Sequence, residues 1–158
     1  MLKRDPRDPS LRSPAESAGS LVQDDADEIM SKIILDSILR KGHGMLLAYD
    51  HGFEHGPTDF DEKSVDPAFI MEIADSGHFT GVIFQKGVAS KYYDKKKHKV
   101  PLIVKLNGKT AFHKGEEPLS LQNCSVDEAI ELGAKAIGYT IYVGSENEQK
   151  MIDEFSAI

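Results

Sequence analysis

The segment Met45-Leu46-Leu47-Ala48-Tyr49-Asp50 is a continuous run of apolar residues that ends in a carboxylate. Three comparable runs follow it, at residues 81–86, 102–107 and 136–142. Apolar and polar residues do not alternate in these runs, which favours strands that are buried on both faces of a parallel sheet. We therefore expect an α/β fold in which four parallel strands lie side by side in the order of the sequence.

Helices are expected before and between these strands. Apolar residues recur at helical spacing between residues 24 and 41, and Gly42 follows them as a natural stop. The later helices begin at capping signals, which are an aspartate before a proline and two Ser-x-x-Glu boxes. These signals are Asp66-Pro67, Ser125 with Glu128, and Ser145 with Glu148. They predict helices within residues 66–77, 125–133 and 145–158.

Two segments are expected to lie outside this regular pattern. Residues 1–23 hold three of the seven prolines and almost no apolar periodicity, so they predict a polar tail without regular structure, with residues 24–158 as the folded part. The link between the second and third strands is rich in lysine and predicts a solvated loop, with a phosphate-attracting rim as the alternative. The lysines of this link are Lys91, Lys95, Lys96, Lys97 and Lys99.

The composition excludes several classes of function. The 158 residues include 26 acidic and 19 basic residues, which give a net charge of −7. Because an acidic chain has no general attraction for phosphate backbones, nucleic-acid binding is disfavoured. The apolar runs are too short to span a membrane, and no signal-peptide pattern follows the basic start. With Cys124 as its single cysteine, the chain is predicted to be cytoplasmic.

Polar side chains at the carboxyl ends of the strands are the candidate functional groups, because active sites of parallel α/β proteins gather there. The candidates at this edge are Asp50, His51, His55, Lys86, Lys105, Asn107 and Tyr142. Asp50 is the candidate general acid or base, with capping of the following turn as the alternative. Alternate strands contribute to the same layer inside a barrel, so Lys105 is expected to pair with Asp50, or else to extend its amine to the barrel mouth.

A metal site is not expected at the two histidines. His51 and His55 are four residues apart, which would place two ligands together if they lay on a helix. Gly52, Gly56 and Pro57 instead indicate a loop, and no convincing third ligand accompanies the pair. The sequence also indicates no cofactor.

The four strands amount to about half of an eight-stranded βα barrel, which takes roughly 250 residues. The expected fold class is therefore α/β, the N-terminal half of a (β/α)8 TIM barrel with about four parallel strands and their helices. The last helix stops at the apolar residue Ile158 without a capping signal, which also fits a partial domain. The alternative is a small open α/β domain with four strands.

Four segments together resemble one enzyme family. Residues 47–57, which contain Asp-His-Gly-Phe-Glu-His-Gly-Pro, resemble the first strand and loop of the archaeal-type class I fructose-bisphosphate aldolases. Residues 102–110 and 138–145 resemble the third and fourth strands of that family, and residues 151–158 resemble the helix that follows. The wider group also contains a synthase of an aromatic-pathway sugar and a thiolase that acts on a quorum-signal phosphate.

The resemblance implies a (β/α)8 barrel and a metal-free mechanism in which a lysine forms a Schiff base with the ketose. It implies a cytoplasmic lyase of glycolysis and gluconeogenesis that cleaves fructose 1,6-bisphosphate into two triose phosphates. The active-site aspartate of the family matches Asp50. The full-length form is expected to be a homo-oligomer that binds a sugar phosphate.

The resemblance also predicts that this chain is incomplete as an aldolase. In the family, the Schiff-base lysine belongs to strand 6 and the acid/base tyrosine follows strand 5, and both would lie beyond Ile158. We therefore expect a truncated chain that lacks the Schiff-base lysine and has no aldolase activity alone, since neither Lys86 nor Lys105 matches the family position. The alternatives are a non-catalytic half-barrel that acts by association, and a related synthase or thiolase of the same family.

Overall fold

The structure is a computed structural model that describes residues 35–112 and 115–158. The chain divides into two compact units, residues 1–36 and 37–158, and the fold below is that of the second unit. The predicted tail at residues 1–23, and residues 24–34 of the first predicted helix, lie outside the described residues. Residues 35–38 are helical, and Gly42 adopts the positive φ of 78° that suits a glycine after a helix.

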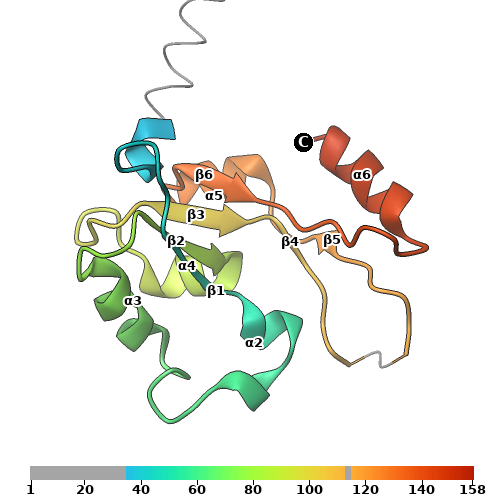
Figure 1. The fold of residues 1–158 in the computed structure, drawn as a ribbon, viewed down its shortest axis with the longest axis horizontal. Helices are drawn as coiled ribbons and strands as arrows, with labels where there is room; N and C mark the ends of the chain where they lie inside the picture. The colour runs from blue at the N-terminus through green and yellow to red at the C-terminus, as the bar shows by residue number, and fades with distance from the viewer. Residues whose placement is uncertain (1–34, 113–114) are drawn as a thin grey trace, which may run out of the picture. The chain divides into compact units, whose positions relative to one another are not determined.

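The core of this unit is a parallel sheet of four strands, as predicted. Its strands are β1 (Leu46–Tyr49), β2 (Gly81–Gln85), β3 (Leu102–Lys105) and β6 (Ala136–Gly138). They lie in the order β1-β2-β3-β6, which is also their order in the sequence (Figure 1). Lys105 is in register with Gln85 of β2 and with Gly138 of β6, so the carboxyl ends of three neighbouring strands meet at one edge.

Burial on both faces is confirmed for β3, holds on one face of β2, where Ile83 and Gln85 of the other face are half-buried, and fails in the two outer strands. All four residues of β3 are buried, and Val82 and Phe84 of β2 are fully buried. In β1 and β6, by contrast, Leu46 is 43% exposed and Ile137 is 39% exposed. The difference follows from position, because within the described sheet each outer strand has a neighbour on only one side.

Two of the predicted helix starts are confirmed by their caps. The Asp66 carboxylate accepts a hydrogen bond of 2.9 Å from the amide of Ala68 at the start of α3 (Pro67–Asp75). Ser125 and Glu128 form a reciprocal capping box at the start of α5 (Val126–Glu131). Both caps satisfy backbone amides that have no partner within the helix.

The predicted capping box of the last helix is wrong. That helix, α6 (Glu148–Ser156), begins after Asn147. The Ser145 hydroxyl donates to the Pro118 carbonyl at 2.8 Å, and the Glu148 carboxylate accepts from the amide of Gly144. Ser145 Oγ accepts from the amide of Asn147 at 3.1 Å rather than from that of Glu148, and the Glu148 carboxylate bonds the amide of Gly144 rather than that of Ser145, so neither bond of the box forms.

A helix also occupies part of the link that was expected to be a loop. This helix, α4 (Lys86–Tyr92), follows β2 directly and packs against β2, β3 and α3 through its buried Ala89. Of the five lysines of this link, Lys91 belongs to the helix and is exposed. The other four, Lys95, Lys96, Lys97 and Lys99, follow the helix and are exposed, as expected of a solvated loop.

Short elements surround the carboxyl ends of the strands. The predicted loop after β1 contains the one-turn helix α2 (His51–Glu54) and the 3-10 turn η2 (Pro57–Asp59). Two-residue strands β4 (Asn107–Gly108) and β5 (Leu121–Gln122) pair antiparallel after β3. A Cβ atom at Gly108 would lie 2.5 Å from the Phe53 ring, so glycine at 108 lets α2 lie directly on β4. No helix within the described ranges is long and apolar enough to cross a membrane.

Asp75, at the end of α3, anchors the segment that leads into β3. Its carboxylate accepts hydrogen bonds of 3.0 Å from the amides of Lys99 and Val100 and lies 2.7 Å from Nδ1 of His98. Burial alone would raise the pKa of Asp75, but the hydrogen bonds from His98, Val100 and Lys99 outweigh it and hold the pKa below its usual range. The ionised form of Asp75 therefore stabilises the fold.

We predict that Asp75→Asn lowers the free energy of unfolding by about 1–3 kcal/mol near neutral pH. Because the pKa is lower in the folded chain, this contribution is complete above the unfolded pKa of about 4 and is lost as the pH falls through the folded value. Urea denaturation of both proteins at several pH values should show their difference shrinking with acidification. Asp66→Asn serves as the control, since asparagine caps a helix as well as aspartate does. A difference that stays constant from neutral to acid pH would contradict the role of the carboxylate charge.

Candidate active site

A buried ammonium group lies between two carboxylates at the carboxyl edge of the sheet. Lys105, the last residue of β3, is only 6% exposed. Its Nζ donates to Oδ2 of Asp50 at 2.5 Å and to Oε1 of Glu54 at 2.7 Å. These distances are those of charge-assisted hydrogen bonds, so the three side chains form one ion cluster.

The predicted pairing of Asp50 with Lys105 is confirmed, and both alternative interpretations of these residues are wrong. Asp50 precedes α2 as its N-cap residue, but its side chain makes no capping hydrogen bond. Lys105 does not extend its amine to solvent, since its side chain is 8% exposed. Strands β1 and β3 are separated by β2, so the two residues meet across the sheet as the alternate-strand layering of a barrel requires.

Glu54 extends the cluster to a third strand end. Its second carboxylate oxygen, Oε2, accepts from the Tyr142 hydroxyl at 2.8 Å, and Tyr142 lies beyond β6. Lys109 lies beside this pair, with its Nζ 3.4 Å from the Glu54 carbonyl oxygen and 5.5 Å from the centre of the Tyr142 ring. The cluster therefore joins side chains that follow or end β1, β3, β4 and β6.

The cluster shifts the acidity of two of its members. Burial alone would lower the pKa of Lys105, but the hydrogen bonds that its amine donates to Asp50 and Glu54 outweigh burial and raise the pKa, so the amine is an ammonium at neutral pH. Burial, the hydrogen bond to Glu54 and the charges of Glu54 and Asp50 all raise the pKa of Tyr142. Tyr142 is therefore a neutral phenol that donates a proton to a hydrogen bond.

Asn107 is a structural clamp between three segments. Its side-chain amide donates to the carbonyls of Ser120 at 3.1 Å and Thr140 at 2.8 Å, and its oxygen accepts from the Thr140 amide at 2.9 Å. The residue is completely buried. Its polar atoms thus hold the chain before β5 and after β6 in place.

The remaining candidates lie in other contacts. Lys86 forms an ion pair with Glu128 of α5, and that pair raises the pKa of the Lys86 amine. His51 packs against the rings of Tyr49 and Phe60, with centroid distances of 5.3 and 4.7 Å. His55 lies 3.3 Å from the Asp59 carboxylate at the surface. Of the residues expected at the mouth, the structure gathers Asp50, Lys105 and Tyr142 into one cluster.

His51 begins the one-turn helix α2, whereas His55 lies in the turn that follows it. Among residues 35–112 and 115–158, no three His, Cys, Asp or Glu side chains gather into a group that could hold a metal ion.

Sequence reasoning missed Glu54 and gave no role to Lys109. Glu54 is 4% exposed although it belongs to a segment with two glycines and a proline, which looked like an open loop. The available signal was the four-residue spacing from Asp50, which brings the two carboxylates to one side when the segment makes a single helical turn.

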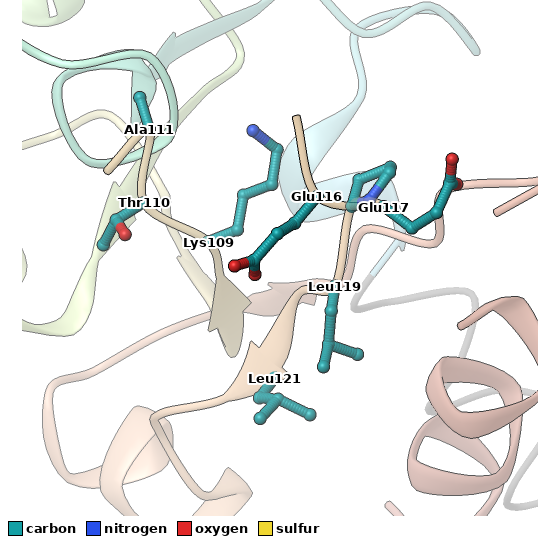
Figure 2. Close-up of a pocket in the computed structure, with 8 residues that line it drawn as sticks. Lys109, Thr110, Ala111, Glu116, Glu117, Leu119 and Leu121 are labelled. Carbon is teal, nitrogen blue, oxygen red and sulfur yellow. The ribbon is translucent and has the colours of Figure 1, made fainter. Parts of the chain in front are cut away.

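A pocket of about 500 Å³ adjoins Lys109. Figure 2 shows Lys109 and Thr110 on the side that follows β4, and Glu116 and Glu117 on the facing segment. Because Lys109 contacts both Glu54 and this pocket, it connects the buried cluster to an open space.

The chemistry available at this site is proton transfer and charge stabilisation. The side chain of Asp50 is 20% exposed, so a substrate can reach this carboxylate of the cluster. Lys105 supplies a fixed positive charge next to that carboxylate, and its protonated amine is not a nucleophile.

Comparisons with known proteins identify the family. A family model described as DeoC/LacD family aldolase matches residues 44–158. The class 1 fructose-bisphosphate aldolase of Thermoproteus tenax is 54% identical over 121 residues, which are 75% of this chain and 44% of that protein. The class 1 aldolase of Halobacterium salinarum is 42% identical over 120 residues, 75% of this chain and 45% of that protein.

Solved structures show the same relation. An archaeal fructose-1,6-bisphosphate aldolase whose catalytic lysine is covalently bound to the carbinolamine intermediate of its substrate matches with a TM-score of 0.73 and 52% identity. The match covers 79% of this chain and 49% of that one, so this chain spans about half the length of its relatives. The parallel sheet and its helices correspond to part of the (β/α)8 barrel of these enzymes, as predicted. The chain therefore belongs to the DeoC/LacD family of aldolases, among the archaeal-type class I fructose-bisphosphate aldolases.

Proposed function

We propose that this chain supplies the aspartate-bearing half of the active site of a class I, Schiff-base fructose-bisphosphate aldolase. The observation that carries the proposal is the Asp50–Lys105–Glu54 cluster, which is buried at the carboxyl edge of the sheet in a member of this aldolase family. That edge is where barrel enzymes place their catalytic groups.

In the proposed reaction, a lysine amine adds to the ketose carbonyl and loses water to give an iminium. The bond between the third and fourth carbons then breaks, and its electron pair moves into the iminium. The hydroxyl proton on the carbon that becomes the aldehyde leaves to a base. Asp50 is proposed to take part in these proton movements, with Lys105 holding the carboxylate in position.

The lysine that forms the Schiff base is proposed to lie outside the described site. Lys105 and Lys86 both have raised pKa values because each is hydrogen-bonded to carboxylate, so both amines carry a proton that prevents attack on a carbonyl. By the resemblance to the family, we expect this lysine on a later strand. We therefore propose that this chain alone does not cleave fructose 1,6-bisphosphate.

The proposed substrate is a sugar phosphate, as the names of the relatives state for them. Lys109 offers an ammonium group next to the Asp50–Lys105–Glu54 cluster, and we propose that it binds an anionic group of the substrate. In the proposed complete form, the enzyme is a homo-oligomer in the cytoplasm.

A second candidate function is a non-catalytic half-barrel that acts by association. The half-exposed apolar residues of the outer strands, Leu46 and Ile137, favour it, because an exposed strand edge is a surface for pairing with another chain. The two candidates differ in whether the site turns over substrate once the barrel is complete.

We predict that borohydride traps no adduct on Lys86 or Lys105 when the 158-residue chain is incubated with fructose 1,6-bisphosphate. Both amines are protonated, so neither adds to the ketose. Intact-mass measurement followed by peptide mapping reads the outcome, with the Thermoproteus tenax aldolase as the positive control. A stoichiometric adduct on either lysine, with turnover, would show that the chain carries its own electron sink.

Joining this chain to the later strands of the Thermoproteus tenax aldolase should give an active enzyme that releases triose phosphates. In that chimera, Asp50→Asn should lower kcat by about 100-fold or more and change KM little, because the carboxylate acts on the proton in the transition state. Asp153→Asn, an exposed substitution on α6, is the control and should leave both constants unchanged. An Asp50→Asn chimera with full kcat would remove Asp50 from the mechanism, and an inactive parent chimera would favour the non-catalytic candidate.

A further inference from the structure

Glu54 is the carboxylate through which the cluster is held together. Each of its two oxygens takes one donor, Oε1 from the Lys105 ammonium at 2.7 Å and Oε2 from the Tyr142 hydroxyl at 2.8 Å. Its side chain is 5% exposed, so water does not compete for either oxygen to any large extent. A buried carboxylate is stable only with such partners.

The position of Glu54 is set by contacts outside the cluster. Its helix α2 is held on β4 by the Phe53 ring, which lies directly over Gly108. The same helix lies close to Phe60, since a Cβ atom at Gly52 would be 2.6 Å from that ring. Two glycine–ring contacts therefore place a one-turn helix that has little stability of its own.

We propose that Glu54 is the positioning residue of this site, whose carboxylate keeps the Lys105 ammonium on Asp50 and the Tyr142 hydroxyl turned inward. This role rests on the proposed aldolase function as far as catalysis is concerned, whereas the positioning itself is a property of the folded chain. The Lys105 ammonium donates to Oδ2 of Asp50. Because Glu54 holds this ammonium from the other side, the ammonium stays in place and fixes the orientation of the Asp50 carboxylate.

Four groups face Glu54, and their charges decide what its loss would do. They are Asp50 after β1, Lys105 of β3, Lys109 after β4 and Tyr142 after β6. Replacing Glu54 by glutamine removes one negative charge next to Tyr142 and leaves Asp50 as the carboxylate partner of Lys105. Burial still raises the pKa of the Tyr142 phenol, but the negative charge of the acceptor that favours its protonated form is lost, so the pKa falls.

The chain contains a second pair of the same kind that serves as an internal control. Tyr139 donates to Oε2 of Glu154 on α6 at 2.5 Å, and burial together with that carboxylate raises the pKa of Tyr139 as well. Glu154 belongs to a separate set of contacts, in which its Oε2 also accepts from the Gln122 amide at 2.8 Å. Substitution of either glutamate should therefore change the pKa of its own tyrosine and leave the pKa of the other tyrosine unchanged.

The experiment is a pH titration of the 158-residue chain with 13C-labelled tyrosine, read by NMR at the ring carbon that carries the hydroxyl. Tyr142→Phe and Tyr139→Phe assign the two signals. Glu54→Gln is expected to lower the pKa of Tyr142 by at least one unit, about a tenfold change in proton affinity, and to leave Tyr139 unchanged. Glu154→Gln is expected to do the reverse. Glu54→Asp, which keeps the charge, is expected to retain part of the shift.

Unchanged titration of Tyr142 in Glu54→Gln would overturn the proposal. If Glu54→Gln unfolds the chain, both tyrosines titrate near the ordinary value of about 10. In that case Glu54→Asp and Lys105→Met replace it in the titration, and a Tyr142 pKa that is unchanged in both variants would overturn the proposal. In the chimera, Glu54→Gln is expected to lower kcat at least tenfold with little change in KM, and Glu54→Asp to restore part of it. An inactive chimera whose tyrosines behave as expected would refute the aldolase function and leave the positioning role intact.

Discussion

A lysine ammonium buried in a protein needs carboxylates at hydrogen-bond distance, and this need organises the carboxyl edge of the sheet. Two carboxylates bind the Lys105 ammonium, one from the end of β1 and one from α2. Loss of both would leave the ammonium unpaired in a poorly solvated environment, which is among the most destabilising changes in a folded protein. The elements that carry Asp50 and Glu54 are therefore tied to β3 by charge as well as by the sheet.

The parts of the structure that could be predicted from sequence are those with a local signal. Unbroken apolar runs marked all four strands, and the order of those strands followed from the tendency of consecutive elements to lie next to each other. The meeting of Asp50 and Lys105 followed from the layering of alternate strands. Ser125 with Glu128 was recognised as a capping box because both bonds are made within four residues.

The parts that could not be predicted depend on contacts between distant residues. The Ser145–Glu148 spacing was that of a capping box, but each side chain bonds a different amide, Asn147 for Ser145 and Gly144 for Glu148, while the Ser145 hydroxyl also donates to the distant Pro118 carbonyl. Helix α2 has too few residues to form by propensity, and it exists because the Phe53 and Phe60 rings find space above glycines. Glu54 was missed for the same reason, since its burial depends on the docking of that helix.

The Phe53–Gly108 contact makes two positions that are far apart in the chain dependent on each other. A methyl group at position 108 would collide with the ring, and the collision could be relieved by a smaller side chain at position 53 or by displacement of the helix. The effects of substitutions at these two sites on stability are thus non-additive. An otherwise mild substitution at one site is tolerated only when the residue at the other site leaves room for it. Variation in the loop after the third strand of the sheet is in this way coupled to variation in the loop after the first.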